Sequence, residues 1–214
     1  ITLGLLPAGT GGDFRRLVRD NTDVESAAGA LGTATSLPID VGHVTYRADS
    51  SADESRWFIN ISSFGIGGLV DRIVNDGSKR LGGKASFFLG TFKALRRYRP
   101  ARVRLVVDGA EQGVFNITNI FVCNGRYAAG GMLFAPEARL GDGLFDVVIT
   151  REMGFLRSLT TAGKFYDGSH VGLPETTSLR GKHIVAKTLS DDPAYIDIDG
   201  EAPGGLPAEY TVHP

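Results

Sequence analysis

The sequence predicts a mainly β domain of the α+β class, an antiparallel β-sandwich with a few helices. From Leu37 onward, short alternating or apolar runs are separated by turns, and 29 of the 214 residues are glycine. Only three stretches in that region carry the apolar spacing of an amphipathic helix. A doubly wound parallel sheet would need a helix between most strands, so the pattern favours antiparallel pairing.

The first expected elements come before the sandwich. Residues 1–6 are predicted to form a short buried strand whose own sheet is expected mostly in sequence upstream, and a glycine-rich turn follows over residues 7–13. Asp13 can cap a helix, because apolar residues recur at helical spacing directly after it. From residue 37 the sequence changes to short alternating or apolar runs separated by turns, which predicts a domain boundary between residues 1–36 and 37–214.

Eight strands and three helices are expected in the larger domain. The strands are residues 39–46, 57–62, 103–107, 114–122, 145–150, 183–187, 194–198 and 210–212. The helices are residues 69–75, 84–98 and 155–166. In the second helix Phe88, Phe92 and Leu95 share one face, which predicts that this face is apolar.

Composition excludes several classes of protein. Apolar residues make up 42% of the chain and charged residues 22%, so the chain can bury a core and is not expected to be disordered. A net charge of −1 argues against a general nucleic-acid binder. Cys123 is the single cysteine and cannot form an internal disulfide, which favours a reducing cytoplasm. No stretch approaches the roughly 18 apolar residues of a membrane-spanning helix.

The turn Gly9-Thr10-Gly11-Gly12 lies between the expected first strand and first helix. Free backbone amides and the positive end of the helix dipole make such a turn an anion site that phosphate can occupy. It is not a Walker loop, because no Lys-Ser/Thr pair follows. A plain tight turn capped by Asp13 explains the residues equally well, so both interpretations stay open.

Three Asp-Gly pairs occur, and between apolar runs such a pair usually makes a hairpin turn. Asp108-Gly109 is interpreted as a hairpin alone. Asp197 and Asp199 fall on one face of a predicted strand and Glu201 follows its turn, a cluster suited to Mg²⁺ or to proton abstraction. The simpler alternative is a solvent-facing strand that ends in a hairpin.

Two further features have both a functional and a structural explanation. In the turn Asp142-Gly143, a carboxylate and neighbouring carbonyls can converge on a hard cation, or the residues form only a turn. Six cations and no acid lie between Lys93 and Arg104. They can attract anionic lipid headgroups at about 1 kcal/mol each, although a solvated face is the simpler interpretation.

Seven segments, in order along the chain, carry a resemblance to a known family. They are residues 6–14 (LPAGTGGDF), 39–42 (IDVG), 60–65 (NISSFG), 124–126 (NGR) leading to 130–131 (GG), 136–138 (PEA) leading to 142–146 (DGLFD), 168–170 (GSH) and 199–201 (DGE). In this order and spacing they resemble the diacylglycerol kinase catalytic-domain family, which includes bacterial lipid kinases and the sphingosine and ceramide kinases. The resemblance covers essentially the whole chain.

The resemblance implies two domains with catalysis between them. In that family a nucleotide domain similar to that of NAD kinases precedes an antiparallel sandwich. Residues 1–36 are then the C-terminal remnant of an NAD-kinase-like α/β nucleotide domain. The chain opens with Ile1 and lacks the family's upstream Gly-Gly-Asp-Gly-Thr motif. We therefore expect further sequence before it, and no turnover by the 214 residues alone.

The resemblance also implies a nucleotide site. By this inference Thr10, with Gly9 and Gly11 beside it, contacts ATP. Asp13 and Asp40 belong to an acidic network linked to Mg²⁺.

The remaining site residues are implied in the same way. Glu201 resembles the general base for the lipid hydroxyl, with Asp199 beside it. The turn at Asp142 resembles the family's structural magnesium site, with the backbone carbonyls of Arg139 and Leu144 as further ligands.

The expected function is Mg²⁺-assisted transfer of the ATP γ-phosphoryl group to the hydroxyl of diacylglycerol or a related lipid. The lipid substrate is expected at the inner face of the membrane, and a homodimer stays open. Phosphoryl transfer needs positioning and charge neutralisation, so no His or Cys nucleophile is required. The alternative is a non-catalytic lipid-binding sandwich derived from the family, for which Gly12, where the family commonly has Asn, is mild support.

Overall fold

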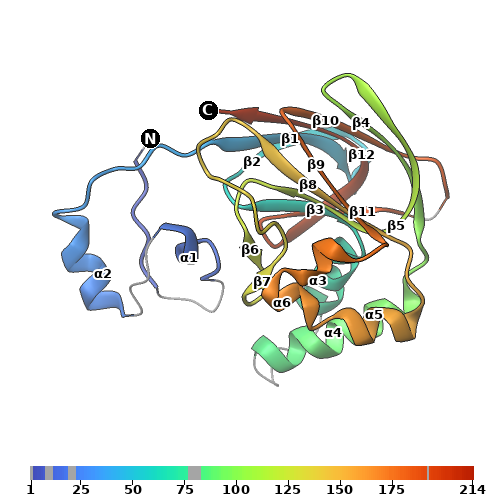
Figure 1. The fold of residues 1–214 in the computed structure, drawn as a ribbon, viewed down its shortest axis with the longest axis horizontal. Coiled ribbons are helices and arrows are strands. Elements are labelled where there is room, and N and C mark those ends of the chain that lie inside the picture. Colours follow the sequence, from blue (N-terminus) through green and yellow to red (C-terminus); the bar gives the residue numbers. More distant parts are fainter. Residues whose placement is uncertain (1, 8–11, 19–22, 77–82, 192) are drawn as a thin grey trace.

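Antiparallel strands outweigh the helices among the described residues, and most helices lie along one edge of them (Figure 1). The computed structural model describes residues 2–7, 12–18, 23–76, 83–191 and 193–214, with the backbone alone at 75–76 and 83–88. The strands are β1 (Val41–Ala48), β2 (Asp53–Phe58), β3 (Ile61–Gly65), β4 (Ala101–Val107), β5 (Ala110–Cys123), β6 (Tyr127–Ala128), β7 (Met132–Leu133), β8 (Phe145–Arg151), β9 (Thr176–Gly181), β10 (His183–Thr188), β11 (Tyr195–Ile198) and β12 (Glu201–His213).

Ten of these described strands form one sheet in which every pairing is antiparallel. Their order is β10-β4-β5-β3-β11-β12-β1-β2, and β8 and β9 branch from β5. Because β10 also pairs with β12, six strands close into a ring that β1–β2 and β8–β9 extend. β5 and β12, with 14 and 13 residues, are long enough to pair with different neighbours along their length. The predicted antiparallel, mainly β fold with a few helices is confirmed.

The core lies inside the folded sheet. Along β4 buried and exposed residues alternate, because successive side chains of a strand point to opposite faces. Phe58 stacks on Phe145 with ring centroids 5.6 Å apart and meets Tyr210 edge-on at 6.2 Å. All three side chains are fully buried. This cluster connects β2, β8 and β12, so it fastens together strands that are far apart in the sequence.

Four helices cover the lower edge of the strands in Figure 1. They are α3 (Ile66–Asp76), α4 (Gly83–Arg97), α5 (Phe155–Thr161) and α6 (Lys164–Asp167). The first two were predicted with bounds close to these. The single helix predicted over residues 155–166 is wrong, because the chain breaks into α5 and α6 around Gly163, a poor residue for a helix interior. Among the described helices, none is both long and apolar enough to cross a membrane.

The predicted N-terminal strand is wrong over the part of it that the structure describes. Residues 2–7 form no strand, because no described strand lies beside them to share hydrogen bonds. The helix expected after Asp13 is a single turn, α1 (Arg15–Val18). The glycines and threonine at 9–11 lie outside the described residues.

A second helix near the N-terminus, α2 (Val24–Leu31), was not predicted. Its N-terminus is capped by Asp23, whose side chain accepts a hydrogen bond from the amide of Ser26 at 2.7 Å. Alanines supply its helical propensity, but its weak apolar stripe gave little periodicity to detect. Figure 1 places α1 and α2 beside the sandwich, joined to β1 by an extended segment.

Three strand predictions need correction. The strand predicted at 57–62 is really the end of β2 and the start of β3, with a break at Ile59 and Asn60. β9 was missed, and β12 begins at Glu201 rather than at Tyr210. Glycines and prolines fill the first half of β12, and such residues are rare in strands, which hid it from a propensity argument.

Candidate active site

The β11–β12 hairpin carries the predicted acidic residues on a two-residue turn. Asp199 and Gly200 adopt positive φ angles of 50° and 93°, so Asp-Gly fits this left-handed turn. The Asp199 carboxylate accepts three backbone hydrogen bonds, from Ile59 at 2.9 Å, Asn60 at 3.2 Å and Ile61 at 3.0 Å. Asp199 therefore fastens the hairpin to the break between β2 and β3, and the hairpin interpretation and the acidic-site interpretation are compatible.

Glu201 lies just beyond that turn, as the first residue of β12. Its side chain is 71% exposed, and its carboxylate forms an ion pair with the guanidinium of Arg56 on β2. The hydrogen bond from Arg56 to this carboxylate raises the pKa of the arginine, so its guanidinium stays charged. The hairpin thus exposes the Glu201 carboxylate to solvent, and Asp199 anchors the turn of the hairpin to the β2–β3 break.

A pair of carboxyl groups lies at the start of the same hairpin. Asp197 on β11 shares a hydrogen bond with Asp71 on α3, and the amide of Gly200 donates to Asp197 at 2.8 Å. Burial and the neighbouring Asp71 charge raise the pKa of Asp197 well above its usual range, and burial also raises the pKa of Asp71. Like charges this close oppose double ionisation, which favours one proton shared by the pair.

Asp40 is buried and bound to a loop rather than to the hairpin. Its carboxylate accepts a hydrogen bond from the amide of Gly143 at 2.6 Å. The side-chain amide of Asn124 donates at 2.8 Å both to the Asp40 carbonyl and to the Ile59 carbonyl. Asn124 therefore connects the Asp40 segment to the same β2–β3 break that holds Asp199.

Asp13 reaches this neighbourhood from the N-terminal segment. Its carboxylate accepts a hydrogen bond from the amide of Gly130 at 2.7 Å, and the Arg16 guanidinium lies 3.4 Å from its second oxygen. Gly130 belongs to the loop that also carries Tyr127, whose carbonyl accepts from the side chain of Asn60 at 2.9 Å. The Asp13 segment thus meets the β2–β3 break through this loop.

The structure therefore brings the segments of Asp13, Asp40, Asp199 and Glu201 to one region, joined by two asparagines. Asn60 and Asn124 each keep one buried side-chain oxygen without a hydrogen bond among the described residues. Asp40 and Asp199 accept backbone hydrogen bonds, whereas the largely exposed carboxylate of Glu201 is bound by the side chain of Arg56. The predicted ATP contacts at 9–11 lie outside the described residues.

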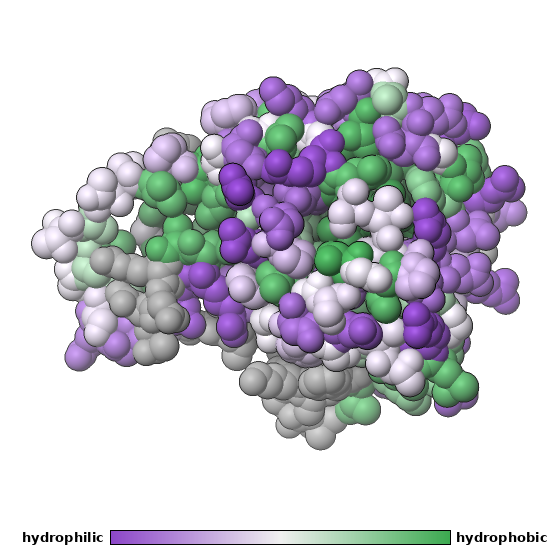
Figure 2. Space-filling model, viewed as in Figure 1, coloured by the Kyte–Doolittle hydropathy of each residue, from purple (hydrophilic) through white to green (hydrophobic). Residues whose placement is uncertain are grey.

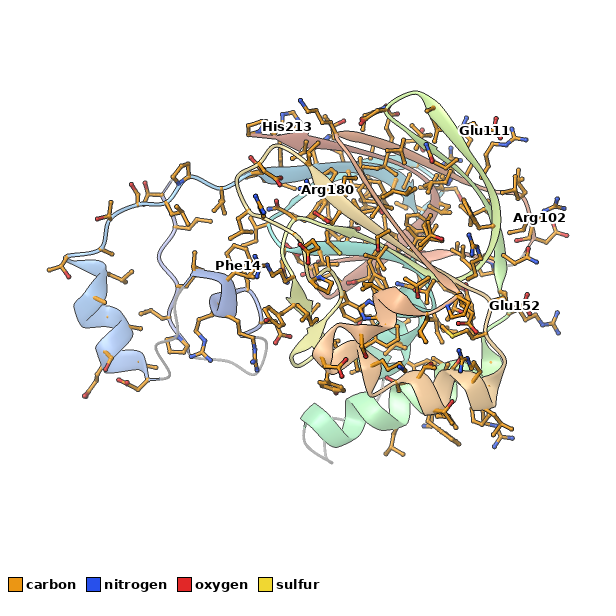
Figure 3. The ribbon with its side chains drawn as sticks, in the orientation of Figure 1. Phe14, Arg102, Glu111, Glu152, Arg180 and His213 are labelled. Atoms are coloured by element: carbon orange, nitrogen blue, oxygen red, sulfur yellow. The ribbon has the colours of Figure 1, made fainter. Side chains whose placement is uncertain are left out.

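The predicted metal turn at Asp142 has a cationic neighbour. One oxygen of Asp142 binds the guanidinium of Arg180, labelled in Figure 3, and the other accepts from the amide of Leu144 at 3.2 Å. Arg180 also lies 3.3 Å from Asp146. No group of three or more His, Cys, Asp or Glu side chains among the described residues is placed to hold a metal. A cation held by Arg139, Asp142 and Leu144 would compete with this guanidinium, and the site stays a prediction.

Sequence reasoning missed four residues that assemble this region. Asn60 and Asn124 belong to segments that carry the family resemblance, but a connecting role shows only in three dimensions. Asp71 gave no signal, because α3 and β11 are remote in sequence. Arg56 lies in a mostly exposed strand, where a solvated charge is the ordinary expectation.

The carboxyl pair predicts a pH dependence of stability. A carboxyl whose pKa is raised by folding stabilises the fold fully below its unfolded pKa, near 4, and loses that contribution as pH rises through the folded pKa. We expect Asp71→Asn to remove part of this loss, since Asp197 then no longer faces a carboxylate. Urea unfolding from pH 4 to 8 should show a smaller decline in the free energy of unfolding for the variant than for the wild type. Asp53→Asn, which removes an exposed carboxylate paired with Arg47, is the control, and parallel pH curves for Asp71→Asn and the wild type would contradict the shared proton.

Several known proteins are similar to this chain. The family model described as the YegS C-terminal NAD kinase β-sandwich-like domain matches residues 60–214. A diacylglycerol kinase of Mycobacterium tuberculosis is 30% identical over 220 residues, which cover 100% of this chain and 67% of that protein. A YegS-like lipid kinase of Stenotrophomonas maltophilia is 30% identical over 202 residues, which cover 94% of this chain and 62% of that protein.

A solved structure gives the same result for the fold. A Bacillus anthracis protein assigned as a diacylglycerol kinase superposes with a TM-score of 0.70 at 23% identity, covering 99% of this chain and 67% of its own. At this identity the similarity establishes the fold alone. The chain spans about two thirds of the length of these proteins.

Proposed function

We propose, because this chain belongs to the family of diacylglycerol kinases and YegS-like lipid kinases, that its protein transfers the γ-phosphoryl group of ATP to a lipid hydroxyl. The observation that carries the proposal is the β11–β12 hairpin, which exposes the carboxylate of Glu201 next to a turn that Asp199 anchors. Diacylglycerol is the acceptor that the names of the relatives support.

The proposed reaction uses Glu201 as the general base. Its carboxylate takes the proton of the lipid hydroxyl while that oxygen bonds to the γ-phosphorus and the bond to the bridging oxygen breaks, which releases ADP. Glu201 later passes the proton to solvent. Magnesium enters with ATP as part of the substrate and neutralises phosphate charge.

The other residues of the site position Glu201 and stabilise the charge of the transition state. Three backbone hydrogen bonds to Asp199 keep Glu201 at a fixed place on the sheet. Arg56 orients the Glu201 carboxylate and adds a positive charge beside the place where phosphate charge develops. Asp13 and Asp40 hold the loops that face the nucleotide. Positioning of this kind accounts for most of the catalysis in phosphoryl transfer.

The direct test is an assay of phosphate transfer from radiolabelled ATP to lipids, using the protein expressed from its complete gene and, in parallel, the 214-residue chain. We expect transfer to diacylglycerol by the complete protein. We expect none by the 214-residue chain, because it spans only about two thirds of its relatives. If the complete protein binds lipid but transfers no phosphate to diacylglycerol, sphingosine or ceramide, the non-catalytic lipid-binding module is correct instead.

A further inference from the structure

We propose that the outer face of α4 and α5 docks on an anionic lipid surface. The α4–α5 face consists of Leu89, Phe92, Lys93 and Arg96 on α4 with Phe155 and Leu156 on α5. The proposal rests on the proposed function, which needs a lipid acceptor, and it names the surface by which the protein reaches the membrane.

The inner side of α4 is built from small residues. Ala94 is fully buried, and Gly90 lies so close to α3 that an added Cβ would stand 2.5 Å from a methyl group of Val74. These residues are one helical turn apart and so lie on the same face. This face is already packed on α3, and Leu89 and Phe92 lie on another side of α4, where they stay exposed.

The outer side exposes apolar side chains that lie together. Leu89 is 48% exposed, Phe92 43% and Leu156 76%. The rings of Phe92 and Phe155 contact each other edge-on, with centroids 5.7 Å apart, so the two helices share one apolar surface. Apolar side chains also show at the lower right of Figure 2, where α5 lies in Figure 1. Contiguous exposed apolar surface of this kind marks an interaction site more often than scattered single residues do.

The same face carries positive charge that described residues leave unneutralised. Residues 83–97 contain four cations and no Asp or Glu. Among the residues that the structure describes, no carboxylate lies within ion-pair distance of Lys93, Arg96 or Arg97. On α5 the single cation, Arg157, is paired with Glu175, so the surplus charge belongs to α4.

Apolar and cationic groups meet in one shallow hollow. It has a volume of about 420 Å³ and is lined by Leu89 and Phe92 together with Lys93, Arg96 and Arg97. This combination fits a phospholipid, whose headgroup phosphate meets the cations while the apolar side chains enter the acyl boundary. The exposed aliphatic side chains of Leu89 and Leu156 suit acyl chains, whereas stacked bases use aromatic or guanidinium planes.

The α4–α5 face is connected to the proposed active site through one helix. α3 packs between α4 and β11, and its Asp71 meets Asp197 at the base of the acidic hairpin. Figure 1 shows α3 in this intermediate position. Docking at α4 and α5 therefore places the lipid surface near α3, the helix that contacts the hairpin carrying Glu201.

The test is flotation of the 214-residue chain, without nucleotide, on phosphatidylcholine vesicles with and without phosphatidylglycerol. We expect binding that requires phosphatidylglycerol and weakens as salt rises, because salt screens charge attraction. The double variant Arg96→Glu/Arg97→Glu should weaken binding at least about tenfold. The double variant Phe92→Ser/Leu156→Ser should weaken it with little change in salt dependence, since it removes the apolar contribution.

The control variant is Lys182→Glu/Lys187→Glu, which changes net charge equally at exposed positions of β10 and of the turn before it. Binding unchanged in the α4 charge variant, or lost equally in the control, would overturn the proposal, provided that circular dichroism shows all variants folded. A mass in solution that halves in the α4 variant, without vesicle binding by the wild type, would identify a second copy as the occupant and would also overturn it. Since no nucleotide or phosphate transfer is involved, failure here leaves the kinase proposal standing, and loss of kinase function leaves vesicle binding unchanged.

Discussion

Glu201→Gln is expected to lower the rate of lipid phosphorylation by the complete protein at least about 100-fold. The amide keeps the size of the side chain and can still bind Arg56, but it cannot take the proton of the lipid hydroxyl. The loss should fall on kcat, with the KM values for ATP and lipid nearly unchanged, because the proton moves only in the transition state. Initial rates with radiolabelled ATP measure it directly.

A matched control lies on the same strand. Glu209 is also an exposed glutamate of β12 in contact with a basic side chain, that of His183 at 2.6 Å. Glu209→Gln should leave the rate within about twofold of the wild type, as surface changes away from a site usually do. Wild-type rates for both variants would show that another group takes the proton and would refute the assignment of Glu201.

Gly204→Ala is expected to destabilise the sandwich by about 3 kcal/mol, the upper part of the range for overpacked sites. A Cβ at Gly204 would overlap the carbonyl oxygen of Arg47 and stand 2.8 Å from the Cα of Ala48. Both neighbours are backbone atoms of β1, paired with β12 next to a bulge, so no side chain can rotate away. Urea unfolding should show a lower midpoint with an unchanged slope.

Gly172→Ala provides the comparison, because it makes the same chemical change where no atom stands within 4 Å of the added Cβ. Its expected effect on the free energy of unfolding is within about 0.5 kcal/mol. An equal loss in both variants would mean that backbone freedom of glycine matters, and that the close approach of β12 to β1 does not.

Much of the fold was predictable because its signals are local. Asp108 and Gly109 adopt φ angles of 50° and 79° between β4 and β5, as an Asp-Gly hairpin requires. The helix α3 showed its apolar periodicity directly. By contrast, residues 2–6 were predicted as part of a strand but form none, because an apolar run does not by itself supply the partner strand that its hydrogen bonds require.

The candidate site was predictable only as a set of acidic residues. That Asp199 turns back to the amides of Ile59 and Ile61 depends on how β3 pairs with β11, which no local pattern encodes. The Arg180 guanidinium on Asp142 depends likewise on the pairing of β8 with β9. The order of residue types along the chain indicated the chemistry. The pairing of strands that are distant in sequence determines which carboxylates stay exposed.

The length of β12 also limits how the protein can respond to ligands. Glu201 begins a strand that pairs with β11, β1 and β10 before it ends at His213. A swing of the hairpin would break ladder bonds in the centre of the sheet, so we expect the hairpin to stay fixed. The N-terminal segment, which Asp13 joins to the turn at Gly130, is the part that we expect to move if nucleotide binds as proposed.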